Sequence, residues 1–379
     1  MRNNFFSAVA ILIGTIAGAG IFGIPYVIAK AGFIPGFLYL LILGFVTLIL
    51  QLCFGEVVLR TKKYHQITGY AKKYLGNWGK GIVTFSLLVG IYGALLAYMI
   101  GTGNFLYVLL GEYLGGTQFL YSMIFFVLAS LAILIGIGMI IQVEKVMVGF
   151  LLFVVGFIFV SNIKQIQVAN FLSVDWSYLF LPYGVLLFAY AGTTAIPQMK
   201  RVLGSNKKNL KKGIILGMLI LFGVYFLFSF AVVGVSGVHT SEEAITGLSK
   251  FVGKKVVIIG ALFGILTMTT SFLTLGLALK EMFRFDWGIN KVIAWVLACF
   301  VPFIIFLLGL TSFIKVIGTA GAIMGGLIGI IILLMYNKAK TEGDVEPAYS
   351  LKLPQLFIYF LFLVFGLGIV YQVYYTFLK

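Results

Sequence analysis

Charged side chains are scarce in this sequence of 379 residues. Asp, Glu, Lys and Arg make up only 10% of the chain, whereas hydrophobic residues make up 61% and the mean hydropathy is +1.12. A soluble domain carries about 25% charged residues, so the composition excludes an ordinary soluble protein. It predicts an all-α polytopic membrane protein whose partner is the lipid bilayer.

Histidine and cysteine are almost absent, with two residues of each type. His65 and His239 lie in separate polar segments and cannot form one catalytic or metal-binding cluster. Cys53 and Cys299 lie in apolar runs, which predicts buried thiols and no disulfide framework. The phosphate-binding motif G-x-x-x-x-G-K-[ST] is also missing. We therefore expect no enzyme, no ATP-driven transport, no cofactor and no metal beyond a possible Na⁺.

Apolar runs long enough to cross a membrane, which requires about 20 residues, recur along the whole chain. We count about eleven such transmembrane helices: 5–30, 34–59, 81–110, 118–141, 145–164, 178–199, 212–236, 253–280, 288–310, 313–336 and 354–377.

Acidic residues are outnumbered, 11 against 27 Lys and Arg, so the net charge is +16. The basic residues gather in alternate polar segments, such as 60–80 and 200–212. This bias follows the positive-inside rule and predicts a cytoplasmic N-terminus, an external C-terminus and a plasma (inner) membrane location. Basic loops beside anionic lipid headgroups explain the charge, so no nucleic-acid partner is expected.

Three polar segments carry signals of their own. Residues 60–80 mix Lys with Tyr and Trp, which predicts a short interfacial helix. Thr240 and Glu243 have the capping-box spacing, which predicts a short external helix that is either a lid or a plain capped loop. Residues 337–353 have the composition of a flexible cytoplasmic linker.

A nine-residue pattern occurs twice, as AGAGIFGIP at 17–25 and AYAGTTAIP at 189–197. The two copies lie in the first and sixth apolar runs, which cross the membrane in opposite directions. We therefore predict an inverted repeat, with one five-helix half at 5–164, a second at 178–336, and an added eleventh helix at 354–377. Interrupted helices at matching positions of two halves point to a transporter binding site.

Glycine and proline in both copies favour broken helices. A second half-helix that begins near Gly20 exposes backbone N–H groups, which suit a carboxylate. First half-helices that end near Gly18 and Tyr190 expose carbonyls, which suit an ammonium group or a small cation. The alternative is helix packing alone, because Gly14-x-x-x-Gly18 also permits close contact between helices.

Ionisable residues are missing from the predicted midplane of every span, so the pocket should prefer a neutral solute. Tyr98, Phe188 and Tyr190 could line an apolar pocket, or could simply pack. Thr270 and Ser271 either bond back to their own helix or complete an oxygen cage for a cation. At the cytoplasmic ends of spans, one set of residues forms either a gate or interfacial anchors: Glu56, Glu281 and Arg284.

Three stretches together resemble the amino acid/auxin permease family and its aromatic amino acid permease relatives. They are GTIAGAGIFGIPYVIAKAGF at 14–33, GEVVLRT at 55–61 and FAYAGTTAIPQM at 188–199. The resemblance implies a LeuT-like fold, which is a five-plus-five inverted repeat with broken helices 1 and 6. It also implies alternating-access uptake of neutral, hydrophobic or aromatic amino acids, coupled to H⁺ or Na⁺.

The resemblance also implies roles for particular residues. The substrate carboxylate would meet the backbone of 19–21, and the amino group would meet carbonyls near 17 and 188. A Na⁺ site would use Gly14, Ala17, Thr270 and Ser271. Some proton-coupled relatives carry a lysine within the fifth span, which this sequence lacks. The full set expected to bind substrate is Ala17, Gly18, Ala19, Gly20, Ile21, Tyr98, Phe188, Ala189, Tyr190, Gly192 and Thr193.

Two other functions remain open from the sequence. A channel would more often line its pore with polar or charged rings, and no such ring is evident. An amino acid sensor would bind a ligand without moving it, and no large signalling domain supports that role. The sequence sets neither the coupling ion nor the oligomeric state.

Overall fold

The structure is a computed structural model, and it describes residues 2–136, 142–248, 251–285 and 287–377. Helices dominate these residues, and no β-strand occurs among them. The α-helices are α1 (Arg2–Ile16), α2 (Gly20–Ala31), α3 (Phe33–Arg60), α4 (Ile67–Leu114), α5 (Gln118–Ile135), α6 (Gln142–Asn162), α7 (Leu181–Ala189), α8 (Ala195–Leu203), α9 (Asn209–Ser236), α10 (Ile245–Leu248), α11 (Lys254–Phe285), α12 (Lys291–Leu307), α13 (Phe313–Glu342) and α14 (Gln355–Phe377). Four 3₁₀ turns join them: η1 (Ile163–Gln165), η2 (Val168–Phe171), η3 (Trp176–Tyr178) and η4 (Gly237–His239).

Each predicted apolar run contains a helix or a helix pair, so the all-α membrane architecture is confirmed. Among the described residues, eight helices are long and apolar enough to cross a membrane, and the bent pair α1 and α2 makes a ninth. The shorter apolar helix α12 and the pair α7 and α8 occupy two further predicted runs. The division into two inverted halves stays a prediction.

The first apolar run is broken where the sequence predicts. α1 ends at Ile16, α2 begins at Gly20, and the two helices are bent by 59°. Pro25 lies in the second turn of α2 rather than in its first turn, where we expected it. Proline lacks an N–H group, so the carbonyl of Ile21 has no partner one turn later in α2.

The sixth run is broken in the same way. α7 ends at Ala189 and α8 begins at Ala195, and Pro197 lies in the first turn of α8, where proline is tolerated. The unwound residues between them form two local turns, because Ala195 N–H donates to the Gly192 carbonyl and Ile196 N–H to the Thr193 carbonyl.

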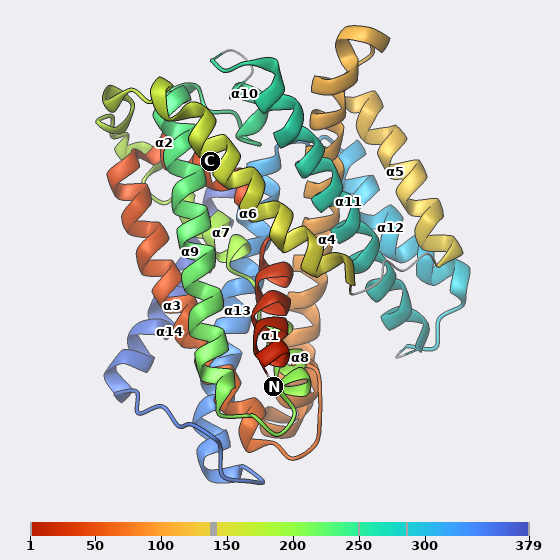
Figure 1. Cartoon of the computed structure of the whole chain (residues 1–379). Helices are drawn as coiled ribbons and strands as arrows, with labels where there is room; N and C mark the ends of the chain where they lie inside the picture. The colour runs from red at the N-terminus through yellow and green to blue at the C-terminus, as the bar shows by residue number, and fades with distance from the viewer. Residues whose placement is uncertain (1, 137–141, 249–250, 286, 378–379) are drawn as a thin grey trace.

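The broken helices lie at the centre of the bundle (Figure 1). α2 packs on α7 and α9, and α1 packs on α8 and α9. α13 crosses beside α7 and α4, while α3 covers the break from another side. α5 and α12 lie at one edge of the molecule, against α4 and α11. Unwound backbone at membrane depth requires burial in protein or contact with a wet cavity, and this packing provides the burial.

The three polar segments agree only in part with their predictions. Residues 67–75 do form the expected short helix, and Gly76, with φ of 74°, bends the chain before the rest of α4. The Thr240 hydroxyl donates to the Gly237 carbonyl, and α10 begins only at Ile245, so the predicted capping box was wrong.

Candidate functional site

A cavity of about 190 Å³ lies between the two broken helices. Its walls come from the breaks and from α3, α4, α11 and α13. Backbone at Gly18, Gly20, Ala191 and Gly192 borders the cavity. A site with unwound backbone on one side and mostly apolar side chains on the other suits a small zwitterion.

Seven of the eleven predicted substrate residues line this cavity: Gly18, Gly20, Tyr98, Phe188, Tyr190, Gly192 and Thr193. The other four, Ala17, Ala19, Ile21 and Ala189, belong to the same two breaks but do not line it. The structure therefore brings the two copies of the sequence pattern together around one space. Whether these residues bind substrate stays a prediction.

The N-terminus of α2 offers donors to this cavity. The first N–H groups of a helix have no carbonyl partner within it and carry a partial positive charge. Gly20 opens α2 and lines the cavity. α8 differs, because its first N–H groups, at Ala195 and Ile196, already bond to the unwound turn. At α2 the Phe22 N–H is bonded to the Ala19 carbonyl, so the donors left for an anionic group are the N–H groups of Gly20 and Ile21.

Glycine at position 20 is required by close contact with the other break. A Cβ added there would lie 2.5 Å from the Cα of Ala189 and 2.7 Å from its Cβ. Gly192 is confined in the same way, because a Cβ there would lie 2.3 Å from Cγ1 of Ile16 and 3.0 Å from Nε2 of Gln51. Gly20 therefore lets α2 meet the backbone of α7 at Ala189, and Gly192 leaves room for the Ile16 and Gln51 side chains.

The carbonyl ends of the two first half-helices share one partner. Tyr225, on α9, donates its hydroxyl to the Ala189 carbonyl at 2.8 Å, and the Ile16 carbonyl lies 3.4 Å from the same oxygen. The Tyr225 side chain is fully buried. The sequence analysis did not single out this residue, because one tyrosine among 20 carries no distinguishing local signal.

The residues expected around a cation do not line the cavity. The Thr270 hydroxyl donates to the Thr267 carbonyl of its own helix at 3.0 Å. For Thr270 this is the predicted bond to its own helix rather than the predicted cation cage. A Na⁺ site that uses Gly14, Ala17, Thr270 and Ser271 stays a prediction.

Gln51 is a cavity residue that the sequence analysis missed. It lies near the middle of α3 and is 1% exposed. Its Nε2 donates to the Tyr190 carbonyl at 3.4 Å and contacts Sδ of Met218 at 3.7 Å. An amide within an apolar run is a signal that could have been used, since polar groups inside a membrane need partners.

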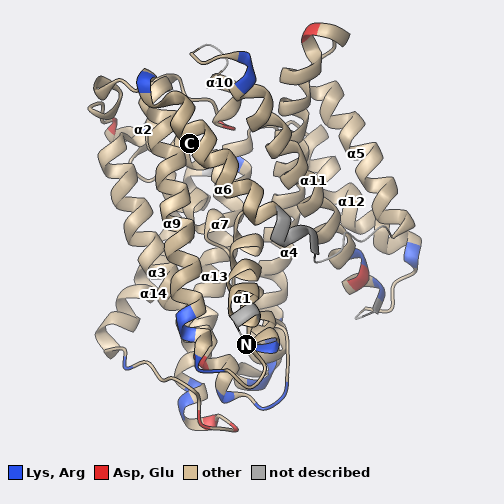
Figure 2. Cartoon of the chain, in the orientation of Figure 1, with Lys and Arg blue, Asp and Glu red and all other residues tan. Residues whose placement is uncertain are grey.

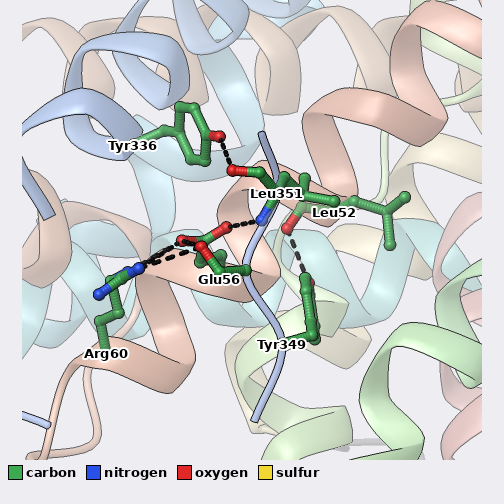
Figure 3. Close-up of polar contacts among 7 residues, drawn as sticks. Leu52, Glu56, Arg60, Tyr336, Tyr349 and Leu351 are labelled. Carbon is green, nitrogen blue, oxygen red and sulfur yellow. Dashed lines mark hydrogen bonds and ion pairs between the residues drawn. The ribbon is translucent and has the colours of Figure 1, made fainter. Parts of the chain in front are cut away.

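Glu56 anchors the segment that joins α13 to α14 (Figure 3). It pairs with Arg60 at 2.8 Å and accepts a 2.6 Å hydrogen bond from the Leu351 N–H. Tyr349 donates to the Leu52 carbonyl and Tyr336 to the Leu351 carbonyl, each at 2.7 Å. These bonds hold residues 349–351 against α3, so the expectation of a flexible linker was wrong.

The predicted gate residues lie apart. Glu56 is on α3, whereas Glu281 and Arg284 are exposed near the end of α11. α11 packs on α4, α5, α6 and α12. The structure thus brings Glu56 together with Arg60 and Leu351 rather than with Glu281 and Arg284. A gating role for any of the three stays a prediction.

Four phenylalanine rings fill the bundle beyond the α2 end of the break. Phe22 lies 5.2 Å from Phe105, 6.2 Å from Phe228 and 5.9 Å from Phe263, measured between ring centroids. All four are at most 3% exposed. The cavity instead extends along α13 from Met324 to Ile332, toward the end of that helix where Tyr336 bonds to Leu351. One end of the bundle is therefore closed by aromatic packing.

A helical membrane bundle with two broken helices around a central cavity is the architecture of a secondary transporter. The comparisons agree. The chain matches the tryptophan/tyrosine permease family over residues 1–372, and it belongs to that family. Its relatives are transport proteins rather than enzymes.

Three curated relatives cover most of the chain. Glutamine transporter 2 of Aliivibrio fischeri is 25% identical over 90% of this chain and 92% of its own length. Tyrosine-specific transport system 1 of Haemophilus influenzae is 25% identical over 84% of each. The tryptophan-specific transport protein of Shigella flexneri is 24% identical over 96% of this chain and 93% of its own.

The fold is also that of a solved structure. The crystal structure of MhsT in complex with L-phenylalanine aligns with a TM-score of 0.66 at 15% identity and covers 98% of both chains. MhsT has the LeuT-like fold. The LeuT-like architecture expected from the sequence is therefore confirmed.

Proposed function

We propose that this protein is a cation-coupled secondary transporter of neutral amino acids with aromatic or polar side chains. The observation that carries the proposal is the pair of helix breaks, which face one cavity and lie in contact at Gly20 and Ala189. The α2 N-terminus supplies donors for a carboxylate, and the carbonyl ends of α1 and α7 supply acceptors for an ammonium group. Relatives named for glutamine, tyrosine and tryptophan support this substrate class.

The substrate side chain would occupy the part of the cavity between α3, α4 and α13. Tyr98, Phe188 and Met324 line it, together with backbone at Gly325 and Gly329. No Asp, Glu, Lys, Arg or His is among the lining residues described. A charged side chain would be buried there without a partner, which is costly, so the cavity favours a neutral amino acid.

The cavity is closed at one end by phenylalanine side chains, as alternating access requires of one side of the membrane at a time. The Phe22 cluster seals one side of the break, while the cavity extends toward the other. Lys and Arg gather at that second end, where α8 and the N-terminus lie (Figure 2). By the positive-inside rule this end is cytoplasmic. The proposed state is therefore inward-facing, with a cytoplasmic N-terminus in a plasma membrane.

The experiment is uptake by the purified protein in proteoliposomes, with H⁺ or Na⁺ gradients imposed separately. We expect saturable uptake of a radiolabelled neutral amino acid driven by one of the two gradients, and its loss in Gly20→Leu. Flux that does not saturate would indicate a channel, and binding without uptake would indicate a sensor. Either result, or full uptake by Gly20→Leu, would overturn the proposal.

A further inference from the structure

We propose that Gln51 determines substrate specificity, because its Oε1 accepts a hydrogen bond from an O–H or N–H donor on the substrate side chain. This inference rests on the proposed function and names the side-chain chemistry that the same cavity selects. It concerns a residue on α3 rather than on either broken helix.

The amide oxygen of Gln51 is a buried acceptor without a partner among the described residues. The other end of the amide is engaged, since Nε2 donates to the Tyr190 carbonyl. That bond sets the orientation of the amide, because the reverse orientation would place two acceptors together. A buried acceptor left unpaired destabilises the empty protein, so a bound donor at this position is favoured.

Two neighbouring polar side chains of the cavity, those of Thr47 and Tyr190, are hydrogen-bonded within the protein. The Thr47 hydroxyl, one turn before Gln51 on α3, donates to the Leu43 carbonyl at 2.7 Å. The Tyr190 hydroxyl donates to the Leu40 carbonyl at 3.4 Å. Both residues line the same cavity as Gln51. Their bonds stay within the protein, whereas the buried Gln51 oxygen has no partner among the described residues.

The Gln51 acceptor determines which substrate side chains the cavity would select. Tyrosine carries an O–H donor on its side chain, and tryptophan and glutamine carry N–H donors. Relatives of this chain are named for these three amino acids. A site built to bond a substrate O–H or N–H strongly rejects an analogue that lacks it, since the protein group is then left unpaired. Phenylalanine is such an analogue of tyrosine.

The experiment compares matched pairs as competitors of uptake in proteoliposomes of the full-length protein. The pairs are L-tyrosine with L-phenylalanine, L-tryptophan with 1-methyl-L-tryptophan, and L-glutamine with L-methionine. The readout is the ratio of inhibition constants within the pair whose donor-bearing member is transported. Both members are measured on one preparation, so the ratio does not depend on the amount of folded protein.

We expect the wild-type protein to prefer the donor-bearing member by about tenfold or more, and Gln51→Met to reduce that ratio about tenfold, the change that one hydrogen bond produces. Gln51→Asn, which keeps the amide but shortens the side chain, should also reduce it. Thr102→Val is the matched control, because it removes a buried hydroxyl that does not line the cavity, and it should leave the ratio unchanged.

An unchanged ratio in both Gln51 variants would overturn the assignment. Equal weakening of both members of the pair would also overturn it, because Gln51 would then contact the ammonium group or serve only packing. Absence of uptake of every amino acid by the wild-type protein is a different result, and it would refute the proposed function itself.

Discussion

Replacement of Gly20 by alanine tests the contact between the two breaks most directly. The added Cβ would lie 2.5 and 2.7 Å from Cα and Cβ of Ala189. Carbon atoms in ordinary contact are about 3.5–4.0 Å apart, so α2 and α7 must separate by about 1 Å. Overpacking of this kind costs about 1–3 kcal/mol. A larger side chain, as in Gly20→Leu, should abolish function altogether.

Two measurements follow from that magnitude. The free energy of unfolding should fall, and a thermal melt in detergent should report a lower midpoint. Amino acid affinity should also fall, because the α2 donors move away from the carbonyl end of α7. Uptake at several substrate concentrations measures this change.

Gly223→Ala is the matched control, because its Cβ meets nothing within 4 Å of position 223 on α9. A helical Gly→Ala change without a clash stabilises by about 0.5–1 kcal/mol, so this variant should transport normally and melt no earlier than wild type. If Gly20→Ala behaved like Gly223→Ala, the two breaks could not be in contact, and the site geometry argued above would be wrong.

Three further predictions concern other parts of the molecule. Arg60→Met leaves the buried Glu56 carboxylate without its charged partner, so the free energy of unfolding should fall by about 3 kcal/mol; an unchanged denaturation midpoint would contradict this. Burial raises the pKa of the Glu243 carboxyl, whose ordinary value is 4.5, so the folded protein binds this proton more tightly than the unfolded chain. The stability that Glu243 contributes should be full below about pH 4.5 and should decline as pH rises through the folded value, a slope that Glu243→Gln should reduce in melts recorded across pH. Cys53 and Cys299 are buried, so both thiols should resist a maleimide reagent in the folded protein and react after denaturation, as mass spectrometry can show.

The breaks could be predicted from the sequence because their cause is local. Gly18, Gly20 and Pro25 weaken a helix by their own backbone chemistry. The second copy of the pattern at 189–197 indicated that both interruptions belong to a binding site. The prediction that α2 begins near Gly20 was therefore correct. The apolar spans were predictable for the same reason, since membrane depth requires continuous apolar stretches.

The partners of those breaks could not be predicted in the same way. Tyr225 and Gln51 act across 36 and 139 residues of sequence, through contacts that exist only after the helices pack. The position of Glu56 at the end of α3 was apparent, but its partner Leu351 lies 295 residues away. Shared position at a membrane face does not identify which residues will be partners, because several helices end at that face.

The Tyr225 hydroxyl connects the ends of α1 and α7. This hydroxyl has one hydrogen to donate, and two helix-end carbonyls, those of Ile16 and Ala189, lie within reach of it. The bond goes to the nearer carbonyl, that of Ala189 on α7, while the Ile16 carbonyl of α1 stays within 3.4 Å of the same oxygen. The carbonyl ends of both first half-helices are thus held beside one side chain of α9.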